Sequence, residues 1–227
     1  RVGPQQVVDD HVEVAATELG SGGADEDEDV ARSVQVGRDG GAGVGHVRCA
    51  VLEDMDRAEG VDGERTHELI GRVVGDRRAL MLDAGSSKAH TRAFLDALWA
   101  KSGARPSTVV YTHSHWDHVF GGAELGGQVI AHAMTAEQLI KLATMDWNDE
   151  ALDQRVAAGH ASPQHAANVK EELPSPRTVE VAPADIVFHH GLDIELGGVT
   201  VRVRHVGGNH SADSSVMYVE PDRVLFL

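Results

Sequence analysis

The sequence has little cysteine and few aromatic side chains. Cys49 is the one cysteine in 227 residues, so an internal disulfide framework is excluded and a reducing compartment is favoured. Long apolar runs are also missing: no stretch is long enough to span a bilayer, and the first residues lack the apolar core of a signal peptide. We therefore expect a cytoplasmic protein without a membrane partner.

Basic residues are scarce as well. Lys and Arg number 20 against 36 Asp and Glu, which gives a formal net charge of −16 at pH 7. Binding to a nucleic-acid backbone or an anionic membrane requires clustered basic residues, so this charge argues against both partners. A small-molecule substrate is the expected partner, and the sequence leaves the oligomeric state open. With 41% hydrophobic residues, the chain can bury the core of one domain that carries an appendage.

Residues 1–70 differ in composition from the rest of the chain. They contain no Phe, Trp, Tyr or Lys, and their 17 acidic residues against 6 Arg account for −11 of the net charge. Burial of so few large apolar side chains hardly offsets the conformational entropy that the segment would lose on folding. One interpretation is therefore a disordered acidic tail. Another is that the segment is not native sequence, because its bias to Val, Ala, Gly, Asp and Arg is typical of a GC-rich gene translated in the wrong frame. Under either interpretation the domain begins at residue 71.

Residues 71–227 show the mixture of strand and helix patterns that predicts a layered α/β domain. Helices are expected at Ala89–Lys101 and after a capping pair formed by Thr135 and Gln138. A partly helical insertion follows at 146–178. Short apolar runs ended by turn residues predict the strands Arg78–Asp83, Thr108–Thr112, Gln128–His132, Val179–Val181, Ile186–Phe188, Leu192–Leu196, Val199–Val206, Val216–Val219 and Val224–Leu227.

Four residues able to bind a metal fall within six positions directly after the predicted strand Thr108–Thr112. They are His113, His115, Asp117 and His118. In extended backbone, side chains two residues apart point to the same side, so the imidazoles of His113 and His115 can face one ion. On a helix they would diverge by about 200°. Neutral imidazole and carboxylate are the usual ligands of zinc and similar divalent ions, so the pattern predicts a metal site.

This segment resembles the H-x-H-x-D-H signature of the metallo-β-lactamase superfamily. The resemblance implies a four-layer αββα sandwich that holds metal ions at one edge. It also implies that His210, in the sequence G-G-N-H-S-A-D, joins His113 and His115 in a first metal site. Asp117 and His118 would contribute to a second site.

The resemblance covers about residues 75–227. It includes a residue that supports the metal ligands, and the sequence departs from the family at its C-terminal end. Asp83, in the sequence L-D-A-G, corresponds to the aspartate that supports the metal loop from behind the ligands. In the family, a bridging aspartate and a later histidine follow the strand that corresponds to Arg223–Leu227. The sequence stops before both, so we expect a truncated C-terminal part. The second site would then have two protein ligands, where a stable site has three or four.

The expected function follows from this ligand set. Three imidazoles leave a position open on zinc for a water whose pKa falls to about 7, and the resulting hydroxide attacks a carbonyl or phosphoryl centre. Asp117 would act catalytically by orienting this nucleophile or accepting its proton.

The resemblance implies one or two Zn²⁺ ions, with iron possible, and a small-molecule ester, thioester, lactone, β-lactam or phosphodiester as substrate. The alternatives are a metal-binding protein without activity, including a truncated inactive member, and an iron-dependent oxidoreductase of the same fold. The insertion at 146–178 is expected to determine specificity.

The composition of residues 1–70 makes a prediction about proteolysis. Limited digestion should release this segment and leave a resistant core that begins near Gly71, because proteases cleave chain that is not packed. Mass spectrometry of the digest identifies the cut sites. Slow hydrogen exchange and protease resistance throughout residues 1–70 would contradict the division.

Overall fold

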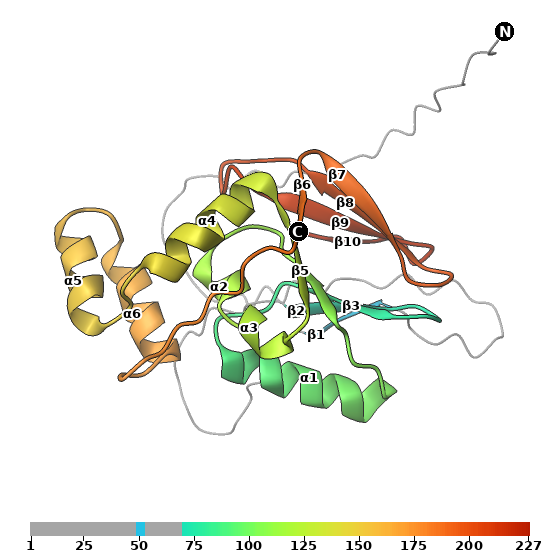
Figure 1. Cartoon of the computed structure of the whole chain (residues 1–227), viewed down its shortest axis with the longest axis horizontal. Coiled ribbons are helices and arrows are strands. Elements are labelled where there is room, and N and C mark those ends of the chain that lie inside the picture. The colour runs from blue at the N-terminus through green and yellow to red at the C-terminus, as the bar shows by residue number, and fades with distance from the viewer. Residues whose placement is uncertain (1–48, 53–69) are drawn as a thin grey trace, which may run out of the picture. The chain divides into compact units, whose positions relative to one another are not determined.

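The computed structural model describes residues 49–52 and 70–227, and within 70–227 it describes every side chain except that of Lys101. The strands form two sheets (Figure 1). The six-stranded sheet contains, in spatial order, β1 (Cys49–Leu52), β2 (Ile70–Val74), β3 (Ala79–Leu82), β4 (Thr108–Val110), β5 (Gln128–His132) and β6 (Ile186–Phe188). The four-stranded sheet contains β10 (Val224–Phe226), β9 (Ser215–Glu220), β8 (Thr200–His205) and β7 (Gly191–Glu195). The helices are α1 (Lys88–Ser102), α2 (Trp116–Val119), α3 (Gly122–Leu125), α4 (Ala133–Thr144), α5 (Asp149–Ala157) and α6 (Pro163–Glu172).

Parallel pairing brings the ends of several strands to one edge of the six-stranded sheet. Strands β3 to β6 pair in parallel, whereas β1 pairs antiparallel with β2 and β2 antiparallel with β3. Asp83 follows the last residue of β3, His113 lies shortly after β4, and His132 ends β5. Because the carboxyl ends of parallel strands meet at the same edge, these three residues share that edge.

Two buried clusters hold the layers together. On one face of the six-stranded sheet, Met81 and Val109 belong to the same apolar cluster as Leu98 of α1. On the other face, Val110 shares a cluster with Met217 of the four-stranded sheet. Fully burying such a side chain stabilises the fold by about 1.5–3 kcal/mol. The predicted layered α/β architecture is confirmed, and the described residues form the helical layer and the two sheets.

Most of the predicted elements are confirmed, with ends that differ by at most two residues. The exception among the strands is Val179–Val181, which is not a strand. Val181 is buried and Val179 partly buried, and both pack on the helical cluster, so these apolar residues cover the core without pairing. Alternation of apolar and polar residues does not distinguish that arrangement from a strand.

The predicted capping pair at Thr135 is wrong. The helix α4 begins at Ala133, and its N-cap is His132, whose Nδ1 accepts a hydrogen bond from the backbone N–H of Met134 at 3.3 Å. Thr135 is buried, and its hydroxyl donates to Oδ2 of Asp213 at 2.9 Å. A tertiary contact therefore uses the hydroxyl that the local pattern assigned to the cap.

Most of residues 1–70 lies outside the described residues, so the predicted nature of that segment stays a prediction. Strand β1 is the part that is described, and it pairs antiparallel with β2 over four residues. Its sequence, CAVL, is a short apolar run, as a strand in a sheet requires. Neither β1 nor β2 was predicted.

The predicted insertion contains the helices α5 and α6. Each begins at a side-chain cap: Asn148 accepts from the N–H of Ala151 at 2.8 Å, and Ser162 accepts from that of His165 at 3.0 Å. Figure 1 shows the two helices beside each other, next to the end of α4. None of the described helices is long and apolar enough to cross a membrane.

The close approach of Gly122 to Tyr111 can be tested. A Cβ at Gly122 would overlap the Tyr111 hydroxyl, which is buried without a hydrogen-bond partner among the described residues. We expect Gly122→Ala to lower the free energy of unfolding by about 1–3 kcal/mol through overpacking. In a Tyr111→Phe background the cost should shrink, because the hydroxyl is gone. Urea denaturation of the wild type, both single variants and the double variant measures this coupling. An equal cost in both backgrounds would show that the overlap is relieved elsewhere.

Candidate metal centre

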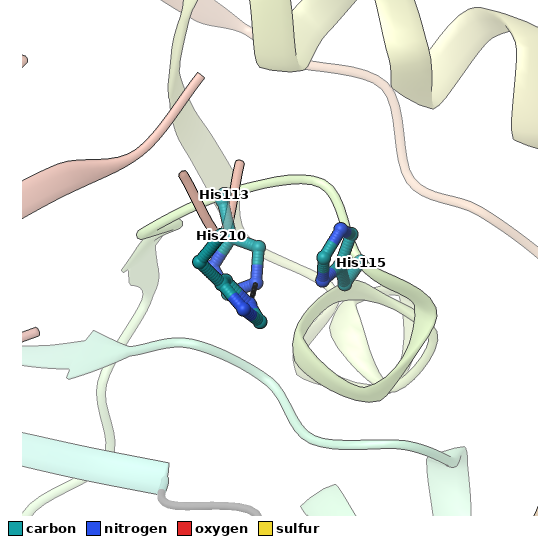
Figure 2. A group of neighbouring side chains, drawn as sticks. All are labelled: His113, His115 and His210. Carbon is teal, nitrogen blue, oxygen red and sulfur yellow. Dashed lines mark hydrogen bonds between the residues drawn. The ribbon is translucent and has the colours of Figure 1, made fainter. Parts of the chain in front are cut away.

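Three histidines from two distant parts of the chain converge at one point. One ring nitrogen from each of His113, His115 and His210 can be chosen so that all three lie within 4.8 Å of one another (Figure 2). The ring centroids of His113 and His210 are 4.8 Å apart, and those of His115 and His210 are 4.7 Å apart. His113 is buried, whereas the other two rings are exposed. The group therefore opens to solvent on one side.

The backbone around these histidines holds the three rings in place. His113 lies in the segment after β4, and His115 is the N-cap of α2 with extended backbone angles. His210 lies in the loop between β8 and β9. That loop is joined to the first segment by the N–H of Ser215, which donates to the carbonyl of Thr112 at 2.8 Å. The two sheets therefore bring together residues 97 positions apart.

Asp83 organises the first segment from behind the histidines. Its side chain is fully buried and accepts from the N–H and from the hydroxyl of Thr112, each at 2.7 Å. A hydroxyl has one proton, so Thr112 can only accept from Nδ1 of His113, at 2.9 Å. Hydrogen-bond accounting thus assigns the proton of His113 to Nδ1 and a lone pair to Nε2, the atom that faces the group.

The same carboxyl group orients His118. Nδ1 of His118 donates to Oδ2 of Asp83 at 2.9 Å, which leaves the lone pair on Nε2. That Nε2 lies 3.7 Å from Oδ2 of Asp117, and the ring centroid lies 4.1 Å from that of His113. Asp117 and His118 thus adjoin the three histidines, although neither belongs to the convergent group found among the described residues.

The donor set fits a divalent metal ion. Nε2 of His113 and Nε2 of His210 are 3.1 Å apart. Two imidazole nitrogens bound to one tetrahedral zinc ion are separated by about 3.3 Å, from Zn–N distances of 2.0–2.1 Å. Because Nε2 of His113 carries a lone pair, the close approach of the second nitrogen is favourable only with a proton or a cation between them.

Desolvation and the neighbouring rings keep His113 and His115 in the neutral form that binds metal. Desolvation lowers the pKa of His113 to about 4, with a further lowering by the neighbouring His118. Desolvation also lowers the pKa of His115, aided by His210. A neutral ring retains the lone pair that a metal ion needs.

A cavity of about 560 Å³ adjoins the group. His115 and Asp117 line it on one side, and the insertion residues Arg155 and His165 line it too. Trp116 is buried and also contributes to the cavity wall. This volume falls within the range typical of pockets for small molecules.

Sequence reasoning missed several residues around the centre. Asp213 is buried, and its hydrogen bonds from Ser211, Thr135 and Ser114 outweigh the effect of burial, so its pKa lies below the ordinary value. These bonds tie the loop of His210 to the metal-binding segment and to α4. The sequence offered one signal for Asp213, its position three residues after His210. Its partners Thr135 and Ser114 are far away in sequence, so local spacing could not indicate them.

Two other histidines form a separate pair near the centre. The rings of His132 and His205 are stacked, with centroids 3.8 Å apart. His132 is bonded to the carbonyl of His189 at 2.9 Å, and His205 to that of Ala212 at 3.0 Å. These hydrogen bonds join strands and loops, so the two rings have a structural role.

Metal content provides the direct test of the convergent group. His115→Ala removes an exposed ligand without opening the core, and metal affinity should fall by more than the 10- to 100-fold typical of losing a supporting hydrogen bond. Asp83→Asn should fall within that range of about 10- to 100-fold, because it weakens the orientation of two rings. Elemental analysis and competition with a chelator measure both.

His190→Ala is the matched control, since His190 is exposed and its ring lies outside the group. It should keep the wild-type metal content. Equal metal affinity in the wild type and His115→Ala would remove His115 from the site.

Known proteins are similar to this chain in sequence and in fold. A model of the metallo-beta-lactamase superfamily matches residues 67–227. The chain is 30% identical over 92 residues to 2,4-dinitroanisole O-demethylase subunit alpha from Nocardioides sp. (strain JS1661), over 36% of this chain and 28% of that protein. Among solved structures, the metallo-beta-lactamase from Pontibacter korlensis is similar with a TM-score of 0.52 and 18% identity, over 78% of this chain and 70% of that one. A motif mutant of the metallo-beta-lactamase from Cronobacter sakazakii has a TM-score of 0.49 and 21% identity, over 69% of this chain and 55% of that one.

These comparisons differ in what they support. The chain spans about half the length of the Cronobacter protein, and its match covers 28% of the demethylase subunit. The similarity to the Pontibacter structure shows the fold. The family model covers well over half of the chain, including the histidine segment and His210. The chain belongs to the metallo-beta-lactamase superfamily.

Proposed function

We propose that this protein is a metal-dependent hydrolase of a small-molecule ester, thioester, lactone, β-lactam or phosphodiester. The observation that supports it is the convergence of His113, His115 and His210 beside a cavity that has Asp117 in its wall. A ligand set of three imidazoles is typical of catalytic zinc, because it leaves a coordination position for water. Membership of the superfamily supports metal-dependent hydrolysis in general.

The three histidines would hold one metal ion, and Asp117 with His118 would contribute to a second. Zinc is the proposed metal, with iron as the alternative, since imidazole and carboxylate suit both. When bound, such an ion acts as a Lewis acid and makes water a nucleophile near neutral pH. The protein supplies the geometry: Asp83 keeps the Nδ1 protons of His113 and His118 pointing away from the centre, through Thr112 in the first case.

Asp117 is the proposed proton acceptor. Its side chain is partly exposed and lines the cavity, so it can reach a water molecule that attacks a substrate there. A carboxylate in this place orients the water and removes its proton as the new bond forms. The Asp117 carboxylate lies 3.7 Å from Nε2 of His118, so the two side chains adjoin the same centre.

Small molecules are the proposed substrates, and nucleic acid and membrane are not proposed as partners. The cavity is of small-molecule size, and the net charge of −16 disfavours binding of a phosphate backbone. The single cysteine supports a reducing compartment, the cytoplasm, as the place of action.

Asp117→Asn should lower turnover by a factor of about 100 to 10,000, because it removes a proton acceptor and a negative charge. Hydrolysis of a panel with one compound from each proposed ester, thioester, lactone, β-lactam and phosphodiester class measures it. The metal content of the histidine group and the unfolding midpoint should change little.

Asp96→Asn is the control, because Asp96 is exposed on α1 and belongs neither to the histidine group nor to the cavity lining. It should leave turnover unchanged. Metal-loaded wild type without activity on any class would favour a non-catalytic metal-binding protein. Full activity in Asp117→Asn would reject Asp117 as the proton acceptor while leaving the hydrolase proposal in place.

A further inference from the structure

The cavity wall contains an arginine whose hydrogen-bonding capacity is only partly used. Nη1 of Arg155 donates to the carbonyl of Asp146 at 2.8 Å. Nη2 is buried and has no hydrogen-bond partner among the described residues. The guanidinium lies over the ring of Trp147, with 4.9 Å between its central carbon and the ring centroid. The indole and the carbonyl therefore hold the group in a defined place.

The neighbouring carboxylates do not neutralise this arginine by direct contact. Four acidic residues lie on or beside α5, and each is hydrogen-bonded to another group: Asp146 to Asn148 at 2.9 Å, Asp149 to Arg177 at 2.8 Å, Glu150 to Gln154 at 3.2 Å and Asp153 to Lys170 at 2.5 Å. Buried donors in proteins are almost always bonded. Arg155 thus lines the cavity with a positive charge that no described carboxylate pairs by direct contact, and this charge points to an anionic ligand there.

The arginine and the metal centre share one cavity. Arg155, His115 and Asp117 all line it. His165 also lines the cavity and senses both groups. Burial lowers the pKa of His165, the negative charge of Asp117 raises it, and the positive charge of Arg155 lowers it further. One molecule in the cavity can thus contact the metal centre and Arg155 together.

The geometry points to Arg155 as the group that binds an anionic oxygen group of the substrate, a carboxylate or a phosphate, away from the bond that is cleaved. This inference rests on the proposed function, because only a hydrolase would bind the anion as part of a substrate. Anion binding itself does not require catalysis. A guanidinium offers a planar pair of donors to two oxygen atoms, which a lysine ammonium cannot match. It deepens the proposal by selecting, among the candidate ester, thioester, lactone, β-lactam and phosphodiester substrates, those with a second, charged group.

Calorimetric titration of the metal-loaded protein with three aromatic probes tests the inference. Benzoate and phenyl phosphate carry the two candidate anions, and benzamide is the neutral match of benzoate. We expect saturable binding of at least one anion and much weaker binding of benzamide. Arg155→Ala should weaken anion binding by about 10- to 100-fold, as for loss of charge-assisted hydrogen bonds. The anion that binds more tightly identifies the carboxylate or the phosphate as the source.

Lys170→Ala is the matched control, because it removes one positive charge from the same insertion but does not line the cavity. It should bind the anions like the wild type. Arg155→Lys should recover little of the affinity, since the planar donor pair is lost. Unfolding midpoints of all variants confirm that the insertion remains folded.

A titration of His115→Ala separates Arg155 from the metal as the anion site. Retained anion binding in His115→Ala with loss in Arg155→Ala supports the inference. Absence of saturable binding, wild-type affinity in Arg155→Ala, or equal affinity for benzamide and benzoate would each overturn it. Loss of binding in His115→Ala alone would also overturn it, because the anion would then sit on the metal. Failure of the hydrolase proposal would appear separately, as normal anion binding without hydrolysis.

Discussion

The arrangement of the metal centre depends on the hydrogen bonds that the buried side chain of Asp83 accepts. A polar group buried at the end of β3 destabilises the fold unless it is hydrogen-bonded, and Asp83 accepts three such bonds. They come from the backbone and hydroxyl of Thr112 and from the ring of His118. Asp83 also adopts a positive φ of 55°, a region that Asp tolerates better than most residues. The need to satisfy one carboxyl group thus sets the orientation of two imidazoles.

The two-sheet packing supplies what this local network lacks. The six-stranded sheet presents His113 and His115 at the carboxyl ends of its parallel strands, and the four-stranded sheet brings His210 to the same place. Asp213 joins the two parts by accepting hydrogen bonds from α4 and from the histidine segment. The apolar cluster between the sheets therefore positions the third histidine as much as any polar contact does.

The insertion has a different physical role from the sandwich. The helices α5 and α6 are capped locally by Asn148 and Ser162, and they also depend on tertiary packing, because Leu152, Ala166 and Val169 are buried in the helical cluster. They enclose one side of the cavity and contribute Arg155 and His165 to its wall. The three convergent histidines all belong to the sandwich, and the insertion contributes none of them.

The sequence by itself determined the features that depend on neighbouring residues. Extended backbone after a buried strand places His113 and His115 on one side, and apolar runs with turn residues predicted most strands of both sheets. The third histidine could be named only through the resemblance, because 97 residues separate His113 from His210. Tertiary structure alone decided the rest: the hydroxyl of Thr135 bonds to Asp213 rather than capping α4, Val181 packs without pairing, and Arg155 lines the same cavity as His115 and Asp117. Each of these depends on which residues meet after folding, and local spacing carries no information about contacts between distant segments.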